Sequence, residues 1–381
     1  MKHLDYFIIE PVGGHGGMNY YNTGLGQGLV SNDACVNLYT CPESQEQSSS
    51  NFTINKFFKG VYGKSNKLVR VTRFIVALVR SIIDIKKKGG KTCHLHFFQY
   101  SLLELMTCHL LRLSGIKIIA TIHDVESFSG TSLNRSHASI LRAPREFIVH
   151  NEFSRQELQR VISAQGLKRK ISVIPHGNYL PFVNRRGLLV SRRRLVLPED
   201  KKIILFFGQI KKVKGLDVLL GAMEIVSKRE PDAVLLIAGK VWKDSFQDYE
   251  HLIKSKNISD IVIQHIRYIK DEDVDFYYSA ANIVVLPYKK IYQSGVLLMA
   301  MSYGCITVSS RLPPMAEVVD EYKNGFLFET DNPEDLAQQI VMALGSSTAQ
   351  QISQNAHATM LKKHDWKRVA RQHIKVFENY E

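Results

Sequence analysis

Ser294 and Gly295 stand between a buried strand and a helix, where exposed backbone can bind an anion. Ile283–Leu286 is a continuous apolar run, typical of a strand covered on both faces, and Pro287 ends it. Ser294 has the side chain of a helix N-cap, and the apolar helix that follows ends at Gly304. A helix that begins just past a parallel strand presents free N–H groups and a positive dipole end. We expect this turn to hold the diphosphate of a nucleotide-sugar; an ordinary turn inside a core is the alternative.

A second turn suited to a ligand follows the first expected strand, Asp5–Glu10. Gly13–Gly17 is a glycine-rich segment that allows close approach to the backbone, and Met18–Val30 is expected to be a helix. The segment does not match G-x-G-x-x-G, and the next strand, Ala34–Tyr39, does not end in the acidic residue that holds a ribose in dinucleotide-binding proteins. We therefore expect no nicotinamide or flavin site. We expect instead that this loop binds the phosphate or the sugar of the nucleotide-sugar, which would be the sugar donor.

His123 directly follows an expected buried strand, Ile116–Ile122. Loops at the carboxyl ends of parallel strands carry function in open α/β sheets, so this histidine is placed where it could meet a donor or acceptor sugar. A structural histidine bonded to Asp124 is an equal alternative.

Length and composition describe a globular protein with room for two domains. The chain has 381 residues, of which 45% are hydrophobic and 23% charged. No apolar run reaches about 18 residues, so a membrane-spanning helix is not expected, and the N-terminus lacks the pattern of a secretion signal. The cysteines are five in number and without C-x-x-C spacing, which indicates reduced thiols in a cytoplasmic protein and no zinc site: Cys35, Cys41, Cys93, Cys108 and Cys305.

The net charge of +14 belongs mainly to the first half of the chain. Residues 1–190 carry 24 Lys and Arg against 12 Asp and Glu, which suits an anionic membrane surface, a phosphate-bearing acceptor or nucleic acid. Lys67–Lys87 is expected to be an amphipathic helix that covers a sheet, and its basic face could also contact anionic lipid headgroups. Its expected apolar face comprises Leu68, Val71, Ile75, Leu78, Ile82 and Ile85.

Short apolar strands alternate with helices through both halves, which predicts an α/β protein with doubly wound parallel sheets. Residues 179–200 contain two prolines and several arginines and are expected to be a linker at a domain boundary. Lys202–Phe207 then opens a second α/β unit.

With these motifs in order, almost the whole chain resembles the retaining glycosyltransferases of family 4. In the second half the resemblance lies in FFGQIKKVKGLDVLL, VLLIAG, PYKKIYQSGVLLMAMSYG, EVVDEYKNGFLF and NPEDLAQQI, and in the first half in GGHGGMN, IIATIHD, FIVHN and ISVIPHGN. The resemblance implies the GT-B fold, with two Rossmann-like domains facing a cleft. Residues 1–180 would form the acceptor-binding domain, residues 181–363 the nucleotide-sugar-binding domain, and residues 364–381 a helix that crosses back onto the first.

The resemblance also implies roles for particular residues. Lys214 and His123 would be the catalytic residues, the lysine at the diphosphate and the histidine near the reacting sugar. No protein nucleophile is expected, because the leaving phosphate takes the acceptor's proton in this family. The donor-binding groups implied are Gly16, Gly17, Lys214, Ser294, Gly295 and Val296 at the diphosphate, and Arg267, Tyr268 and Ile269 at the nucleobase.

Three positions depart from the family pattern. Gln209 replaces the usual arginine before the lysine-glycine pair, and Lys211 or Lys212 is expected to supply the missing charge at the phosphate. Ile291 and Met299 replace two glutamates, so the usual carboxylate partners of sugar and ribose hydroxyls are missing.

The resulting expectation is a retaining hexosyltransferase-type enzyme that moves a sugar from a nucleotide-diphosphate sugar to a glycan or lipid-linked acceptor. It would act in surface polysaccharide or glycolipid biosynthesis, in the cytoplasm or on the inner face of the plasma membrane. No metal cofactor and no nucleic acid partner is expected, since neither a cluster of Asp, Glu and His nor a nucleic-acid-binding module stands out. A GT-B binding protein without activity and a sugar-nucleotide epimerase are the alternatives.

Overall fold

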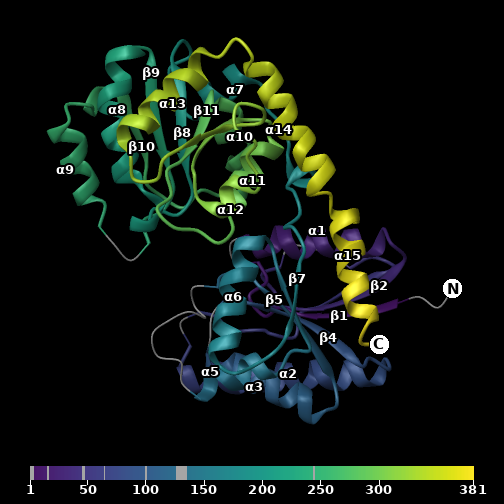
Figure 1. The fold of residues 1–381 in the computed structure, drawn as a ribbon. Coiled ribbons are helices and arrows are strands. Elements are labelled where there is room, and N and C mark those ends of the chain that lie inside the picture. The colour runs from purple at the N-terminus through teal and green to yellow at the C-terminus, as the bar shows by residue number, and fades with distance from the viewer. Residues whose placement is uncertain are drawn as a thin grey trace. The chain divides into compact units, whose positions relative to one another are not determined.

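The computed structural model describes residues 4–14, 17–44, 48–63, 65–98, 101–125, 135–242 and 245–381, without the side chains of residues 135–138. The chain divides into two compact units (Figure 1). The first consists of Met1–Gly177 and Lys363–Glu381, and the second of Asn178–Lys362.

The first unit is built on a parallel sheet whose described strands have the order β3-β2-β1-β4-β5-β6-β7. The strands are β1 (Leu4–Ile9), β2 (Ala34–Tyr39), β3 (Phe52–Asn55), β4 (Thr92–Phe97), β5 (Lys117–Ile122), β6 (Glu146–Val149) and β7 (Lys170–Val173). The helices include α1 (Met18–Val30), α2 (Lys67–Lys87), α3 (Leu102–Leu113), α5 (Arg135–Arg142), α6 (Glu152–Ala164) and α15 (Trp366–Glu378). Because the strands are parallel, their carboxyl ends share one edge, where Gly17 and His123 follow β1 and β5.

The second unit has a parallel sheet in the order β10-β9-β8-β11-β12-β13. Its strands are β8 (Lys202–Phe207), β9 (Ala233–Ala238), β10 (Val262–His265), β11 (Ile283–Leu286), β12 (Ile306–Ser310) and β13 (Phe326–Phe328). Its helices include α7 (Leu188–Arg194), α8 (Leu216–Arg229), α9 (Gln247–Ser255), α10 (Asp271–Ala280), α11 (Gly295–Ser302), α12 (Pro313–Ala316), α13 (Pro333–Gly345) and α14 (Ala349–Lys363). The prediction of two Rossmann-like parallel-sheet domains is confirmed.

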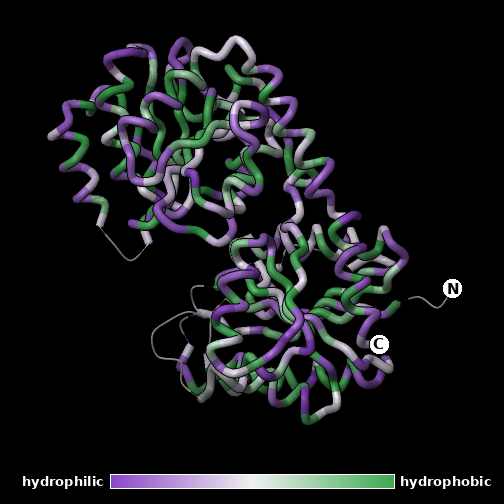
Figure 2. The backbone as a smooth tube through the Cα atoms, in the orientation of Figure 1, coloured by the Kyte–Doolittle hydropathy of each residue, from purple (hydrophilic) through white to green (hydrophobic). Residues whose placement is uncertain are grey.

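Each sheet runs through the core of its own unit. Every residue of β9 and β11 is buried, as expected for apolar strands in a parallel sheet whose faces are covered. Figure 2 shows the hydrophobic segments inside each unit and the hydrophilic ones mainly around it. Burial of this apolar surface is the main driving force for folding each unit.

Helix α15 belongs to the core of the first unit although it lies at the end of the chain. Trp366, Val369 and Phe377 are buried with residues of α1, β1 and β2. The Phe377 ring stacks on Tyr6 of β1 with ring centroids 4.1 Å apart. The last helix therefore stabilises the first unit directly.

One expectation about local structure was wrong, and another was right in part. The arginine-rich part of the expected linker forms α7, in which Arg192 is buried and donates to the carbonyl oxygens of Glu199 and Ala280. On α2, Leu78, Ile82 and Ile85 of the expected apolar face are buried, and Val71 and Ile75 are partly buried. Leu68, in the first turn, is instead 76% exposed.

Candidate functional site

The turn before α11 has the geometry of an anion site in the second unit. The Ser294 Oγ accepts a hydrogen bond from the Leu297 N–H at 3.1 Å and so caps the helix. Among the described residues, neither the Gly295 N–H nor the Val296 N–H has a hydrogen-bond partner. Two half-buried donors at the positive end of the helix dipole therefore remain for a ligand. Of the groups expected to bind the diphosphate here, the Ser294 hydroxyl oxygen already accepts the capping hydrogen bond of the helix.

A side chain at position 295 would not fit. A Cβ built on Gly295 would lie 2.6 Å from the hydroxyl oxygen of Tyr179, well inside van der Waals contact. Tyr179 is buried, and its N–H donates to Ser302 Oγ at 3.0 Å, which fixes it against α11. Because Gly295 has no side chain, Tyr179 can pack against the start of the helix.

The Lys214 turn is held against the end of β11. Gly215 has a positive φ of 66°, and a Cβ there would lie 1.8 Å from the Pro287 carbonyl oxygen. The Lys289 N–H donates to the Val213 carbonyl at 2.9 Å. The fold therefore brings Lys214 to the strand whose loop leads into α11.

Tyr288 links the lysine to the helix start. Lys214 Nζ lies 3.7 Å from the centroid of the Tyr288 ring, in cation–π contact. The Tyr288 hydroxyl is hydrogen bonded to the side chain of Ser294. Desolvation, with a smaller contribution from Lys211, lowers the pKa of Lys214 to about 7. A desolvated ammonium beside two free N–H groups is suited to stabilising a phosphate, whose charge would raise this pKa again.

The neighbouring phosphate candidates are less constrained. Gln209 and Lys212 are exposed at the turn that follows β8. Lys211 is partly buried, with its Nζ 5.0 Å from the centroid of the Trp242 ring. Ile291 and Met299, which replace the family's glutamates, are partly buried on the loop and helix of the same βα unit.

The predicted nucleobase loop lies at the same edge of the sheet, three strands from β11. It follows β10, and the Arg267 N–H donates to the His265 carbonyl at 2.9 Å. Tyr268 is 67% exposed, whereas Ile269 is partly buried. An exposed aromatic ring beside available backbone is suited to a planar base.

In the first unit, a buried carboxylate that the sequence analysis missed shapes the glycine turn. Glu10 accepts hydrogen bonds from the N–H groups of Val12 (2.9 Å) and Gly13 (2.7 Å) and from the side chain of Asn22 (2.9 Å). Burial raises the Glu10 pKa although these bonds oppose the shift. The available signal was an acidic residue at the end of an apolar strand just before glycines. Gly17 is exposed at the N-cap of α1, and Gly16 lies outside the described residues.

His123 is the middle member of a hydrogen-bonded row of three histidines. Its Nε2 lies 2.9 Å from His96 Nδ1, and its Nδ1 lies 3.2 Å from His150 Nε2. At the end of the row, His150 Nδ1 lies 3.1 Å from the carbonyl oxygen of Ile174. The structural role expected for His123 is thus present, with histidines as the ring's partners instead of Asp124.

The Ile174 carbonyl sets the direction of every hydrogen bond in this row. A carbonyl oxygen only accepts, so His150 carries its proton on Nδ1 and accepts from His123 through Nε2. By the same reasoning His123 accepts from His96, whose Nε2 has no partner among the described residues. Desolvation, followed by the neighbouring rings, lowers the pKa of His96 and of His123 well below the ordinary value. The row is therefore neutral, and His123 has no free nitrogen to act as a base.

The described part of the chain has neither a metal-binding cluster nor a membrane-spanning helix. There, no group of three or more His, Cys, Asp or Glu side chains could hold a metal ion. Likewise, no described helix is long and apolar enough to cross a membrane.

Comparison with known proteins identifies the second half of the chain. Residues 190–378 match the family model described as glycosyl transferases group 1. This segment is similar to the glycosyl transferases of group 1. It contains Lys214, the loop at 267–269 and the turn at 294–296.

Several curated proteins are similar to parts of this chain. Spore coat protein SA of Bacillus subtilis is 26% identical over 189 residues, which cover 47% of this chain and 49% of that protein. An uncharacterized glycosyltransferase of Haemophilus influenzae is 29% identical over 42% of this chain and 44% of its own length. The chain thus matches about half the length of these relatives. A D-inositol 3-phosphate glycosyltransferase of Nocardiopsis dassonvillei is 20% identical over 86% of this chain and 81% of that protein.

Solved structures share the fold over the whole chain. Sucrose-phosphate synthase from Thermosynechococcus elongatus has a TM-score of 0.78 at 20% identity and covers 99% of both chains. Anabaena HepE in complex with UDP and glucose has a TM-score of 0.74 at 14% identity, covering 99% of this chain and 100% of that one. These neighbours are glycosyltransferases of the GT-B type, so the predicted fold class is confirmed.

Proposed function

We propose that this protein transfers a sugar from a nucleotide-diphosphate sugar to a glycan or lipid-linked acceptor, with retention of configuration. One observation carries the proposal: the Lys214 ammonium lies over the Tyr288 ring, and the Tyr288 hydroxyl is hydrogen bonded to the side chain of Ser294 at the start of α11. This arrangement offers an ammonium and two N–H groups to a departing diphosphate. The similarity of the segment that contains it to the glycosyl transferases of group 1 supports a transferase.

The chemistry would rest on stabilising the leaving group. The acceptor oxygen forms a bond to the anomeric carbon while the bond from that carbon to the phosphate oxygen breaks. The acceptor's proton passes to the departing phosphate, so no protein nucleophile is needed. Lys214 and the N–H groups of Gly295 and Val296 would stabilise the negative charge that develops on the phosphate. No residue of this set requires a metal ion.

We assign the other donor contacts as follows. Arg267, Tyr268 and Ile269 would bind the base, and Gly16 and Gly17 would also bind the diphosphate. Lys211 and Lys212 would add positive charge where Gln209 adds none. His123 would lie near the reacting sugar as a positioning residue, because both of its ring nitrogens bind other histidines.

A uridine nucleotide is the first donor to test. Anabaena HepE, which shares the fold, has been solved with UDP-glucose. The base is read in this proposal by an exposed loop rather than by a buried pocket, so a panel of UDP-, GDP- and ADP-sugars is needed.

We also propose that the protein works in the cytoplasm, at the inner face of the plasma membrane, in surface polysaccharide or glycolipid biosynthesis. Helix α2 supports this location, because its solvent side carries Val69, Val76 and Ile83, each 44–54% exposed, beside Arg73 and Arg80. Apolar and basic side chains on one exposed helix face are suited to the surface of an anionic bilayer.

The test combines binding with transfer. We expect one nucleotide-sugar of the panel to raise the melting temperature, and Lys214→Ala to reduce transfer to an acceptor by about a hundredfold or more, as for loss of a group that stabilises leaving-group charge. Wild-type transfer by Lys214→Ala would exclude this lysine from the mechanism. Stabilisation without transfer to any acceptor would favour a binding protein, and conversion of the sugar-nucleotide without acceptor would favour an epimerase.

A further inference from the structure

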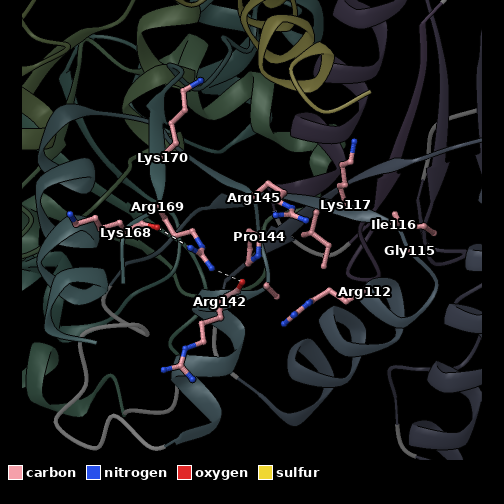
Figure 3. A pocket seen from close by; sticks show the side chains of 12 residues that line it. Arg112, Gly115, Ile116, Lys117, Arg142, Pro144, Arg145, Lys168, Arg169 and Lys170 are labelled. Carbon is pink, nitrogen blue, oxygen red and sulfur yellow. Dashed lines mark hydrogen bonds between the residues drawn. The ribbon is translucent and has the colours of Figure 1, made fainter. Parts of the chain in front are cut away.

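A pocket lined by cations lies on the first unit, at the amino ends of its strands (Figure 3). Its volume is about 560 Å³, within the range of ordinary ligand sites. Seven of its twelve lining residues are basic, and none is acidic: Arg112, Lys117, Arg142, Arg145, Lys168, Arg169 and Lys170.

Three stretches of the chain, next to five helices and strands, bring these charges together. Lys117 and Lys170 begin β5 and β7, Arg145 precedes β6, and Arg112 and Arg142 lie in the last turns of α3 and α5. In a parallel sheet the amino ends of the strands lie at the edge opposite to their carboxyl ends. The pocket is therefore at the opposite edge of the sheet from Gly17 and His123, and it is not part of the proposed transfer site.

Part of this charge has a structural partner, and part has none. The positive charges of Arg112 and Arg142 interact favourably with the negative dipole ends of the helices that carry them. Lys170 Nζ lies 3.1 Å from the buried carboxylate of Glu146. Within the described residues, the other pocket cations, Arg145 and Lys168 among them, form no ion pair.

Two of the pocket cations are held in place by backbone carbonyls. Arg169 donates to the carbonyl oxygens of Lys168 and Arg142, both at 2.9 Å, which leaves three of its five N–H donors for a ligand. Lys117 Nζ donates to the Tyr380 carbonyl at 2.6 Å. A fixed guanidinium loses little conformational entropy when it binds an anion.

The side chains approach the pocket from different sides. In Figure 3, Arg169 turns toward the Arg142 carbonyl and Arg112 extends from the opposite side of the view. Lys117, Arg142, Lys168 and Lys170 extend away from this centre. The buried residues Ile116, Ala143 and Pro144 line the same pocket.

We propose that this pocket binds an anion that carries at least two phosphate groups. Arginine forks match phosphate oxygens bidentately, and cations from three stretches of the chain are better used by several phosphates than by one. The same chemistry could come from a soluble pyrophosphate-bearing molecule or from the headgroups of an anionic membrane. A site of this kind would bind its anion away from the reaction centre.

The test uses the full-length protein with Lys214→Ala throughout, so that pyrophosphate cannot bind to that lysine. Inorganic pyrophosphate is titrated by calorimetry at low salt into this protein and into the same protein with Arg112→Ala and Arg145→Ala. We expect the pair of substitutions to weaken binding by about tenfold or more, the effect of losing one or two charge-assisted hydrogen bonds. Binding should also weaken as salt is raised.

A matched control removes two other arginines from the same unit. Arg155 and Arg160 on α6 are exposed, do not line the pocket and form ion pairs with Glu152 and Glu157. Arg155→Ala with Arg160→Ala should change pyrophosphate affinity less than twofold, because surface pairs contribute little. Circular dichroism confirms that each variant is folded, and Arg112→Gln with Arg145→Gln replaces the alanine pair if it is not.

A second arm identifies the source of the phosphates. Vesicles of phosphatidylcholine with phosphatidylglycerol are sedimented with each protein. Weaker binding of the pocket variant to both pyrophosphate and vesicles would assign the pocket to membrane headgroups, and loss for pyrophosphate alone would assign it to a soluble ligand. Equal affinity of pocket and control variants for pyrophosphate would overturn the proposal.

Discussion

At the scale of single residues, the candidate donor site depends on a lysine whose charge is easily lost. Lys214 lies against the face of Tyr288 and is desolvated, and its pKa is lowered to about 7. A bound diphosphate favours the protonated lysine and raises this pKa. Donor binding and protonation of Lys214 are therefore linked.

The first prediction concerns the pH dependence of donor binding. Below pH 7 Lys214 is protonated with or without ligand, so its contribution to affinity is constant. Above pH 7 the free protein loses this proton and must take one up on binding, so affinity falls, by at most about tenfold per pH unit. Calorimetry of a nucleotide-sugar at pH 8 in buffers of different ionisation enthalpy should show proton uptake. Lys214→Arg is the control, since arginine stays charged; an identical pH profile in that variant would contradict the linkage.

The second prediction concerns Gly295. Its replacement by alanine brings a Cβ within 2.6 Å of the Tyr179 hydroxyl, so the start of α11 must shift. We expect Gly295→Ala to cost about 1–3 kcal/mol of stability and to weaken donor binding. Tyr179→Phe removes the clashing oxygen, and adding it to Gly295→Ala should recover part of both losses. Strictly additive effects in this double-mutant cycle would show that the contact is not responsible.

At the scale of elements, α15 packs against the first unit through Trp366, which lies close to three glycines. Built Cβ atoms at Gly24, Gly28 and Gly177 would lie 2.1, 2.4 and 2.2 Å from atoms of Trp366. Gly24 faces the indole ring, and Gly28, one turn further along α1, faces the backbone carbonyl of Trp366, so the helix offers a groove for this residue. The ring also meets Tyr21 edge-on, with centroids 5.3 Å apart.

The third prediction follows from this contact. Trp366→Ala should destabilise the first unit by about 3–5 kcal/mol, the usual cost of a large aromatic cavity. Gly24→Ala should destabilise it as well, because the added methyl overlaps the ring. Gly115→Ala is unsuitable as a control because its φ is positive, but Gly345→Ala meets nothing within 4 Å and has no such strain. Thermal unfolding compares these variants; if Gly24→Ala and Gly345→Ala behaved alike, the fit of the tryptophan would be irrelevant to stability.

At the scale of the whole molecule, buried histidines make stability depend on pH. Desolvation lowers the pKa of His94 and His176 to about 3 and of His150 to about 4. Desolvation and then His94 lower the pKa of His373 well below the ordinary value, and both of its ring nitrogens lack partners among the described residues. These rings are neutral in the folded chain and charge at about pH 6.5 when it unfolds. The stability that depends on these rings staying neutral is fully present above pH 6.5. It is lost as the pH falls below 6.5, because the unfolded chain then binds more protons than the folded one.

The fourth prediction isolates one of these rings. His373→Leu removes a titrating group and two unpaired nitrogens, so it should be at least as stable as the parent at pH 7.5. The advantage should grow as pH falls, by about 2 kcal/mol between pH 6.5 and pH 5, since one group contributes about 1.4 kcal/mol per pH unit. Melting temperatures across this range provide the measurement. A difference that does not change with pH would mean that His373 is protonated or solvated in the folded state.

The sequence by itself determined the features that depend on local pattern. Apolar runs and helical periodicity predicted two parallel-sheet units, and the segment from Ile283 to Gly304 indicated a strand, a capped turn and a helix. Those features follow from burial and backbone geometry within a few residues of each other. The exposed start of α2, at Leu68, and the helix α7 were misjudged because the fold decides which part of a segment is covered.

Only the tertiary structure decided which distant residues became partners. Tyr288 and Tyr179 joined Lys214 and Gly295, the histidines of β4, β5 and β6 joined into one row, and a late tryptophan filled a groove on the first helix. The cations at the amino ends of β5, β6 and β7 converged in the same way. No spacing in the chain specifies these contacts, because they arise from strand order and chain crossing, which bring together side chains that are far apart in sequence.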